Sequence, residues 1–176
     1  MQFSDLHLHL SLLKKLTEEN LLQPYPIQEK SIPAILQGKD ILGIAPTGSG
    51  KTLGYVLPLL MNLQKSQELR NRHIHTLIVV PTRELAVQVE KVIQNYGQTF
   101  SPRIKSLAVY GGVSINPQMI QMQNVQILVA TPGRLLELVV SKAVHLSSVE
   151  TLVLDEADKM MDLGFKEEMD RIISFL

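Results

Sequence analysis

Five short apolar runs, each followed at once by a polar or glycine-rich segment, restrict the folds open to this sequence. The runs are rich in Val, Ile and Leu and show little polar alternation, which is typical of strands buried on both faces of a parallel sheet. Helical periodicity separates them. The pattern predicts an α/β fold with three layers, in which a mainly parallel, twisted sheet lies between helices. The five predicted strands are Asp40–Ala45, Thr76–Val80, Lys105–Tyr110, Gln126–Ala130 and Thr151–Asp155.

Composition excludes several classes of protein. The 176 residues suffice for one domain, and 45% hydrophobic with 19% charged residues argues against disorder and coiled coil. There is no cysteine, hence no disulfide or thiolate nucleophile, and 17 basic residues balance 17 acidic ones, so no global basic field indicates a nucleic-acid partner. The most apolar stretch, Leu53–Met61, falls far short of the roughly 20 residues that span a bilayer. We therefore expect a soluble, cytoplasmic protein that does not bind membranes.

The first run leads into a glycine-rich segment that ends in Gly-Lys-Thr and precedes a helix-forming stretch. Gly48 and Gly50 permit a backbone whose N–H groups point at a phosphate. Lys51 can reach the β- and γ-phosphates, and the Thr52 hydroxyl can bind Mg²⁺. The strict consensus has glycine where Ala45 stands, and the alternative is a glycine-rich turn with an exposed lysine. The predicted nucleotide-binding residues are Ala45, Pro46, Thr47, Gly48, Ser49, Gly50, Lys51 and Thr52.

The last run ends in the acidic segment Asp155-Glu156-Ala157-Asp158. An Asp at a strand end is the usual partner of a phosphate loop, where it holds Mg²⁺ directly or through water. Glu156 is suited to orient and deprotonate an attacking water. Metal ligands are therefore predicted at Thr52 and Asp155. The alternative is that these acidic residues only stabilise the start of a helix.

The other three strand ends also suggest anion binding. Arg83 and Arg134 each stand in the first turn of a predicted helix, where the helix dipole disfavours a cation. A nearby external anion would explain both, since helix N-termini bind anions. Thr82 and Thr131 are predicted helix caps. The alternatives are ordinary capped helices, a plain loop after the third run, and arginines that point to water.

Together these segments resemble those of the DEAD-box RNA helicases, whose name is spelled at Asp155–Asp158. The resemblance is specific and covers essentially the whole chain. It implies a RecA-like fold that binds ATP and Mg²⁺, with catalysis by Lys51, Asp155 and Glu156. It implies that RNA runs across these strand ends through sequence-independent backbone contacts. The implied RNA-binding residues are Pro81, Thr82, Arg83, Gly111, Gly112, Thr131, Pro132, Gly133 and Arg134.

The same resemblance implies an adenine-reading segment within residues 1–29. Pro24, Pro26, Ile27 and Gln28 match this segment, and Phe3 stands where the family has an upstream aromatic residue. Gln28 is expected to hydrogen-bond both a donor and an acceptor edge of adenine, and Phe3 to pack against the ring. Asn20, Leu21 and Tyr25 replace the residues that the family usually has, namely Gly, an aromatic residue and Thr.

Residues 1–176 would then form the first RecA-like domain, truncated before the family's Ser-Ala-Thr strand, to which Asp158 is expected to couple. The second RecA-like domain, which carries an arginine finger, is absent, so we expect a monomer with little activity by itself. In the whole protein we expect ATP hydrolysis coupled to local RNA unwinding. A nucleotide-gated RNA clamp or assembly scaffold is the alternative, because clamps keep the same motifs. A metabolic P-loop kinase would leave Pro81–Ala86 and Thr131–Arg134 unexplained.

Overall fold

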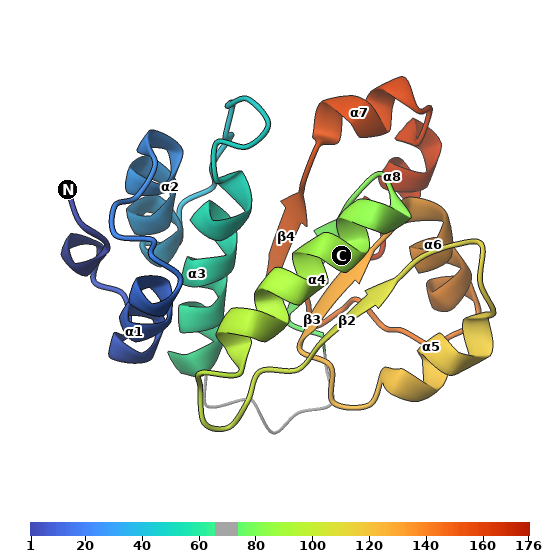
Figure 1. Ribbon diagram of the computed structural model, residues 1–176. Coiled ribbons are helices and arrows are strands. Elements are labelled where there is room, and N and C mark those ends of the chain that lie inside the picture. The colour runs from blue at the N-terminus through green and yellow to red at the C-terminus, as the bar shows by residue number, and fades with distance from the viewer. Residues whose placement is uncertain (66–73) are drawn as a thin grey trace. The chain divides into compact units, whose positions relative to one another are not determined.

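The computed structural model describes residues 1–65 and 74–176, which divide into two compact units (Figure 1). Of the described residues, 1–65 and 92–104 form the first unit, and 74–91 and 105–176 form the second. In these described ranges no helix is long and apolar enough to cross a membrane.

The first unit is helical. Fully buried leucine and isoleucine side chains, among them Leu12, Leu16, Ile32 and Leu57, form its interior. A close approach of two helices is possible at Gly54, because a Cβ there would lie 2.7 Å from the Ser31 hydroxyl oxygen. Its elements are the 3₁₀ helix η1 (Phe3–Leu6), α1 (Leu10–Glu18), α2 (Pro26–Leu36), α3 (Lys51–Lys65) and the last part of α4 (Arg83–Gly97).

The second unit contains a parallel four-stranded sheet in the order β2-β3-β1-β4. The strands pair in register at their ends, so that Val79 is opposite both Ala130 and Leu154, and Val109 is opposite Ala130. Four of the five predicted strands are thus confirmed, with bounds shifted by one residue at most. They are β1 (Thr76–Val79), β2 (Ser106–Val109), β3 (Ile127–Ala130) and β4 (Thr151–Leu154).

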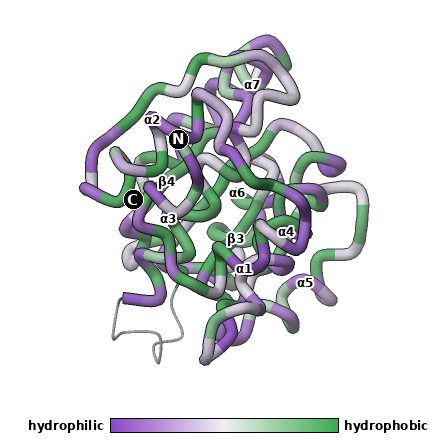
Figure 2. The backbone as a smooth tube through the Cα atoms, turned by 60° about the vertical axis from the view of Figure 1, so that its left-hand side comes forward, coloured by the Kyte–Doolittle hydropathy of each residue, from purple (hydrophilic) through white to green (hydrophobic). Residues whose placement is uncertain are grey.

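The inner strands of this sheet are buried on both faces. Leu77 and Leu128 belong to a core with side chains of three helices, including Leu135 and Ile172, whereas the neighbouring Ile78 points to the opposite face and is also fully buried. The apolar character of β3 is visible in Figure 2. The α/β fold class is confirmed. The helices of this unit are the first part of α4, α5 (Ile115–Gln121), α6 (Pro132–Val140), α7 (Ala157–Asp162) and α8 (Lys166–Ile173).

One of the five predicted strands is wrong. Residues 39–46 form no strand, and Leu42 and Ile44 are 87% and 85% exposed. Apolar composition favours a strand but cannot supply the hydrogen-bonded neighbour that a strand requires, and within the described ranges the segment has none. Gly97 is the last residue of α4 and has no positive φ. A Cβ on Gly97 would lie 3.4 Å from the Ile104 carbonyl oxygen, so close packing accounts for this glycine.

Candidate functional site

The glycine-rich loop of the first unit has the backbone that a phosphate loop needs. Gly48 and Gly50 have φ angles of +80° and +83°, a region that residues with a Cβ rarely adopt. Helix α3 begins directly afterwards at Lys51, and the first main-chain N–H groups of a helix lack intrahelical acceptors. The Ser49 hydroxyl is buried and has no hydrogen-bond partner. Free donors beside a helix N-terminus fit the oxygen atoms of a phosphate.

The Lys51 side chain folds back onto the main chain of this loop. Its ammonium group donates to the carbonyl oxygens of Ala45, at 2.5 Å, and Pro46, at 3.0 Å. The lysine therefore lies along the loop, with its charge beside the segment predicted to hold phosphates. The neighbouring Thr52 is half-buried in the first turn of α3.

Gln28 braces the loop from α2. Its side chain is 1% exposed, its amide oxygen accepts from the Tyr25 N–H at 2.9 Å, and its amide nitrogen donates to the Gly50 carbonyl at 2.9 Å. One amide hydrogen and one lone pair remain for another partner. Adenine recognition by Gln28 stays a prediction, and the structure adds a bracing role that the sequence did not reveal. Pro26 begins α2, where its fixed φ suits the first helical position.

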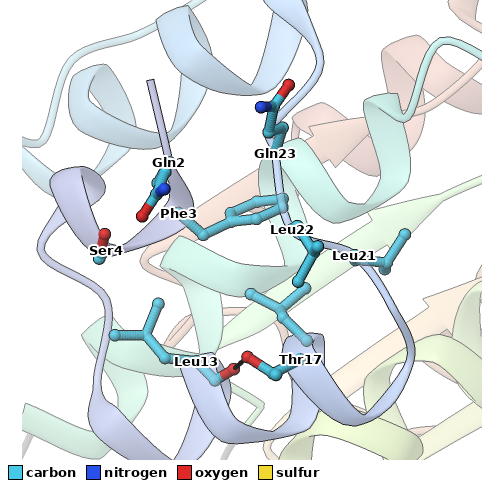
Figure 3. Close-up of a pocket in the computed structure, with 9 residues that line it drawn as sticks. Gln2, Phe3, Ser4, Leu13, Thr17, Leu21, Leu22 and Gln23 are labelled. Carbon is cyan, nitrogen blue, oxygen red and sulfur yellow. Dashed lines mark hydrogen bonds between the residues drawn. The ribbon is translucent and has the colours of Figure 1, made fainter.

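Phe3 lies 4% exposed in the wall of a pocket of about 290 Å³ (Figure 3). The pocket is lined by both apolar and polar side chains, and Leu21 contributes where the family usually has an aromatic side chain. Gln28 is not among its lining residues, so the structure does not bring Phe3 and Gln28 to the same pocket. Asn20, where the family has Gly, adopts φ +59°, which asparagine tolerates better than most residues. The lining residues are Gln2, Phe3, Ser4, Leu13, Leu16, Thr17, Leu21, Leu22 and Gln23.

The acidic segment of the second unit begins where β4 ends. Asp155 is 8% exposed, and its N–H donates to the Val79 carbonyl at 3.0 Å, which extends the pairing by one residue beyond the strand. Its carboxylate accepts from the Glu156 N–H at 3.0 Å. Asp158 is exposed and accepts from the Lys159 N–H at 2.9 Å. The main chain thus fixes Asp155, while Asp158 faces outward.

Glu156 has an unusual backbone. Its φ of +52° and ψ of +47° lie in the left-handed region, although it is not a glycine. Such a conformation costs about 1–2 kcal/mol and tends to occur where function requires it. The Glu156 carboxylate lies 3.3 Å from the Lys159 ammonium group, an ion pair one helical turn away. The tight turn therefore aims a carboxylate from the end of a strand.

A metal ion would have to share its ligands with a substrate here. In the described ranges no group of three or more His, Cys, Asp or Glu side chains could hold a metal by itself. Mg²⁺ is usually held by one or two carboxylates together with phosphate oxygens and water. One buried carboxylate at Asp155 fits that type of site.

The predicted RNA segments of the second unit share one edge of its sheet. Pairing continues one residue past the strands, since Val80 N–H donates to Ala130 and Thr131 N–H to Val109. All four strand ends therefore emerge on the same side, as expected for parallel strands. The Thr82 hydroxyl accepts from the Leu85 N–H at 3.3 Å, which confirms it as a helix cap. Thr131 has the N-cap position of α6, with Pro132 next, but its side chain makes no capping hydrogen bond.

At two positions on this edge, neither packing nor backbone conformation requires a glycine. A Cβ on Gly111 or Gly133 would have no heavy atom within 4 Å, and neither residue has a positive φ. Both are exposed. Glycine at such positions fits the close approach of a partner's backbone.

The two arginines of this edge differ. Arg83 is exposed, and its guanidinium lies 4.8 Å from the centre of the Tyr110 ring, a cation–π contact. Arg134 is 6% exposed and donates to the Glu137 carboxylate, the Gln118 side-chain oxygen and the Val113 carbonyl. An external anion is thus not needed to explain Arg134, and Arg134 does not point to water. Gln118, which the sequence analysis missed, gave no local signal beyond being a polar residue on a helix.

Comparisons with known proteins agree with this geometry. A parallel sheet with an acidic strand end, together with a glycine-rich loop before a helix, is typical of the P-loop class of nucleotide-binding proteins. The model of the DEAD/DEAH box helicase family matches residues 25–176. The chain therefore belongs to the DEAD/DEAH box helicase family.

Similar proteins come from distant organisms. The chain is 41% identical over 175 residues to the DEAD-box ATP-dependent RNA helicase RhpA of Helicobacter pylori (strain B128), covering 99% of this chain and 34% of that protein. It is 41% identical to DEAD-box ATP-dependent RNA helicase 20 of Oryza sativa subsp. japonica, covering 98% of this chain and 35% of that protein. The crystal structure of the yeast DEAD-box splicing factor Prp28 matches with a TM-score of 0.86 at 36% identity, covering 95% of this chain and 40% of that chain. The chain spans about a third of the length of the curated relatives it matches.

Proposed function

We propose that this chain is the ATP-binding RecA-like domain of an ATP-dependent RNA helicase. The observation that carries the proposal is the sheet of the second unit, whose four parallel strands end on one edge in the family's segments. The loop of the first unit, with its two left-handed glycines, supports the same function. In the whole protein, ATP hydrolysis would be coupled to local separation of RNA strands.

The first unit supplies the phosphate contacts. The main-chain N–H groups of Gly48, Ser49 and Gly50 are assigned to the phosphates, because they lie beside a helix N-terminus. The Ser49 N–H would exchange its partner within the loop, the Pro46 carbonyl at 3.3 Å, for a phosphate oxygen. The Lys51 ammonium exchanges its carbonyl partners for β- and γ-phosphate oxygens and stabilises the charge that develops on them. Thr47 and Ala45 shape the loop, while Phe3, Pro26 and Gln28 are assigned to the base.

The second unit supplies the acidic groups Asp155 and Glu156, which are assigned to metal and water. Asp155 is assigned as a ligand of Mg²⁺, as is Thr52 of the first unit, and the ion would neutralise phosphate charge when bound. Glu156 orients a water molecule and removes its proton, and its left-handed turn aims the carboxylate. Asp158, exposed beside it, is assigned to coupling with the Ser-Ala-Thr strand.

RNA contacts are assigned to the edge formed by the strand ends. Exposed glycines at Gly111 and Gly133 let the sugar–phosphate backbone approach closely. Helix N-termini after Thr82 and Thr131 offer N–H groups to phosphates. The contacts go to phosphate and ribose, so binding is independent of base sequence. The remaining assigned residues are Pro81, Arg83, Gly112 and Pro132, with Arg134 on the inner side of the same edge.

A second RecA-like domain of the same protein is the proposed partner. In related phosphoryl transfer an arginine finger contributes about 10³–10⁵ in rate. The 176 residues by themselves should therefore bind ATP weakly and hydrolyse it very slowly, as a monomer. Robust RNA-stimulated turnover by this chain alone would contradict the assignment.

The test is ATP and RNA binding by the full-length protein with two matched variants. Lys51→Ala should abolish nucleotide affinity, because it removes the phosphate-bound cation. Glu156→Gln keeps shape and size, so it should preserve nucleotide binding and stop hydrolysis. Equal loss of binding in both variants would contradict the roles assigned to them.

Two further measurements separate the alternatives. ATP-dependent retention of RNA without strand separation would favour an RNA clamp or scaffold over a helicase. Transfer of phosphate to a specific small molecule would favour a P-loop kinase. Strand separation of a short duplex, dependent on ATP and lost in Glu156→Gln, supports the helicase.

A further inference from the structure

Gln118 joins an edge strand to a helix. It lies in α5, is 8% exposed, and pairs with the main chain of Tyr110 in both directions. Its amide oxygen accepts from the Tyr110 N–H at 3.3 Å, and its amide nitrogen donates to the Tyr110 carbonyl at 3.2 Å. Strand β2 is an edge strand of the sheet, so no strand of the described residues pairs with its outward polar groups. The Gln118 amide takes the place of that neighbour at the residue where β2 ends.

Arg134 extends this connection to the start of α6. One terminal nitrogen of its guanidinium donates to the Gln118 amide oxygen at 3.0 Å, and the other donates to the Val113 carbonyl at 2.7 Å. The third guanidinium nitrogen, Nε, donates to the Glu137 carboxylate at 2.8 Å. A buried charge is retained only where its hydrogen bonds are satisfied, and here three of them are. The Gln118 oxygen uses both lone pairs, one for Tyr110 and one for Arg134.

The result is a connected network beneath the edge to which RNA is assigned. The segment 111–114 is held at Tyr110 by Gln118 and at Val113 by Arg134. Arg83, which follows β1, lies over the Tyr110 ring, although β3 separates β1 from β2 in the sheet. Three strand-end segments are thereby linked, two of them through the Gln118 amide and the third through the Tyr110 ring.

We propose that Gln118 and Arg134 are positioning residues, which fix the loop 111–114 against the first turn of α6 and so set the RNA affinity of this edge. The proposal rests on the RNA-binding function proposed above and deepens it. Arg134 then acts through Val113 and Gln118 and makes no phosphate contact of its own.

Salt dependence distinguishes positioning from direct contact. Each phosphate neutralised by a cation contributes about 0.7 to the slope of log binding constant against log salt for a single strand. A positioning arginine contributes nothing to that slope. The measurement is fluorescence anisotropy of a labelled single-stranded oligouridylate with the full-length protein and a non-hydrolysable ATP analogue, over a range of KCl concentrations.

Four variants make the test specific. Gln118→Leu has similar volume but no hydrogen bonds, and it should weaken RNA binding about tenfold, which is the effect of losing roughly one or two buried hydrogen bonds. Arg134→Met should weaken binding to a similar degree with the salt slope unchanged. Gln118→Glu still accepts from Tyr110 and Arg134 but can no longer donate to the Tyr110 carbonyl, so its loss of RNA affinity should be smaller than that of Gln118→Leu. Gln121→Leu, on an exposed site of the same helix, is the matched control and should bind as the wild type does.

The double variant adds a second criterion. Gln118→Leu with Arg134→Met should bind RNA no more weakly than either single variant, because residues of one network are not additive. Binding of a fluorescent ATP analogue should be the same in all variants, which shows that each is folded. Should Gln118→Leu fail to fold, the comparison of Gln118→Glu with Arg134→Met carries the test.

Three results would overturn the proposal. The first is wild-type RNA affinity in Gln118→Leu, and the second is a slope reduced by about 0.7 in Arg134→Met, which would make that arginine a phosphate ligand. The third is additive loss in the double variant. Absence of RNA binding by the wild type itself, with ATP binding intact, would instead overturn the proposed function on which this inference rests.

Discussion

The side-chain amide of Gln28 donates a hydrogen bond of 2.9 Å to the carbonyl oxygen of Gly50 and joins α2 to the loop before α3. The contact is close enough to exclude any side chain at position 50. A Cβ there would lie 2.4 Å from Gln28 Nε2 and 2.8 Å from a ring carbon of Tyr25. Gly48, in contrast, has the same left-handed backbone with nothing within 4 Å of its missing Cβ.

We therefore predict that Gly50→Ala is more harmful than Gly48→Ala. Gly48→Ala adds only backbone strain of about 1 kcal/mol. Gly50→Ala adds the same strain and displaces the buried amide of Gln28, for a loss of about 2 kcal/mol or more in unfolding free energy. Urea denaturation of the two variants measures the difference. Equal destabilisation would mean that the Gln28 contact contributes nothing.

Gly133→Ala should separate stability from RNA affinity. Gly133 lies in the first turn of α6 with open space around it, so alanine should raise the unfolding free energy by up to about 1 kcal/mol. The added methyl group would meet the RNA backbone, and affinity for single-stranded RNA should fall. Thermal unfolding and RNA titration together check this. A stabilised variant with unchanged RNA affinity would remove Gly133 from the contact surface.

The Glu19–Tyr96 pair should make stability depend on pH. Partial burial acts to raise the pKa of Glu19, but hydrogen bonds from Tyr96, Asn95 and Lys15 outweigh it and leave this pKa below its ordinary value. Burial, followed by the nearby Glu19 carboxylate, raises the pKa of Tyr96. The contribution of Glu19 to the free energy of unfolding is fully present above the ordinary glutamate pKa. It is lost as pH falls below that value. The tyrosine contribution is lost as pH rises above about 10, where the unfolded chain ionises first.

Tyr96→Phe tests that pair. It removes the 2.6 Å hydrogen bond to Glu19, so we expect a loss of about 1 kcal/mol at neutral pH and a flatter dependence on pH at both ends. Urea midpoints measured from acid to alkaline pH provide the readout, with Tyr110→Phe as the control for losing a phenol elsewhere. An unchanged pH profile in Tyr96→Phe would contradict the assignment.

Because Glu156 has a left-handed backbone, we predict that replacing it with glycine raises stability and abolishes catalysis. Glu156→Gly relieves strain of about 1–2 kcal/mol and loses an exposed ion pair with Lys159 that is worth less. The variant should unfold at higher temperature while losing ATP hydrolysis. Glu156→Ala loses the same carboxylate but keeps the strain, so it should gain no stability. If both variants gain equally, the backbone strain is not the cause.

The sequence predicted the parts of the fold that depend on local composition. Buried strands such as Ile127–Ala130 are apolar without interruption, and Thr82 before a periodic helix predicts a cap. It failed where long-range partners decide the outcome. Asp40–Ala45 has the composition of a strand, but within the described ranges no neighbouring strand pairs with it.

The candidate site shows the same division. The glycine-rich loop and the acidic turn could be predicted because each is a motif of consecutive residues. The connection of Gln118 to Tyr110 and Arg134 was not, since it joins residues 8 and 16 positions apart through side-chain geometry. Burial of Arg134 could not be inferred from its place in a first helical turn.

The exposed apolar segment at Asp40–Ala45 has a practical consequence for handling the protein. Ile41, Leu42 and Ile44 are exposed apolar side chains in a segment with the composition of a strand, and β4 is an edge strand of the sheet that the described residues form. Neighbouring chains in concentrated solution can add to such surfaces as they do in amyloid-forming peptides. Preparations of these 176 residues will therefore tend to precipitate as concentration rises, and a lysine in place of Leu42 should improve their shelf life.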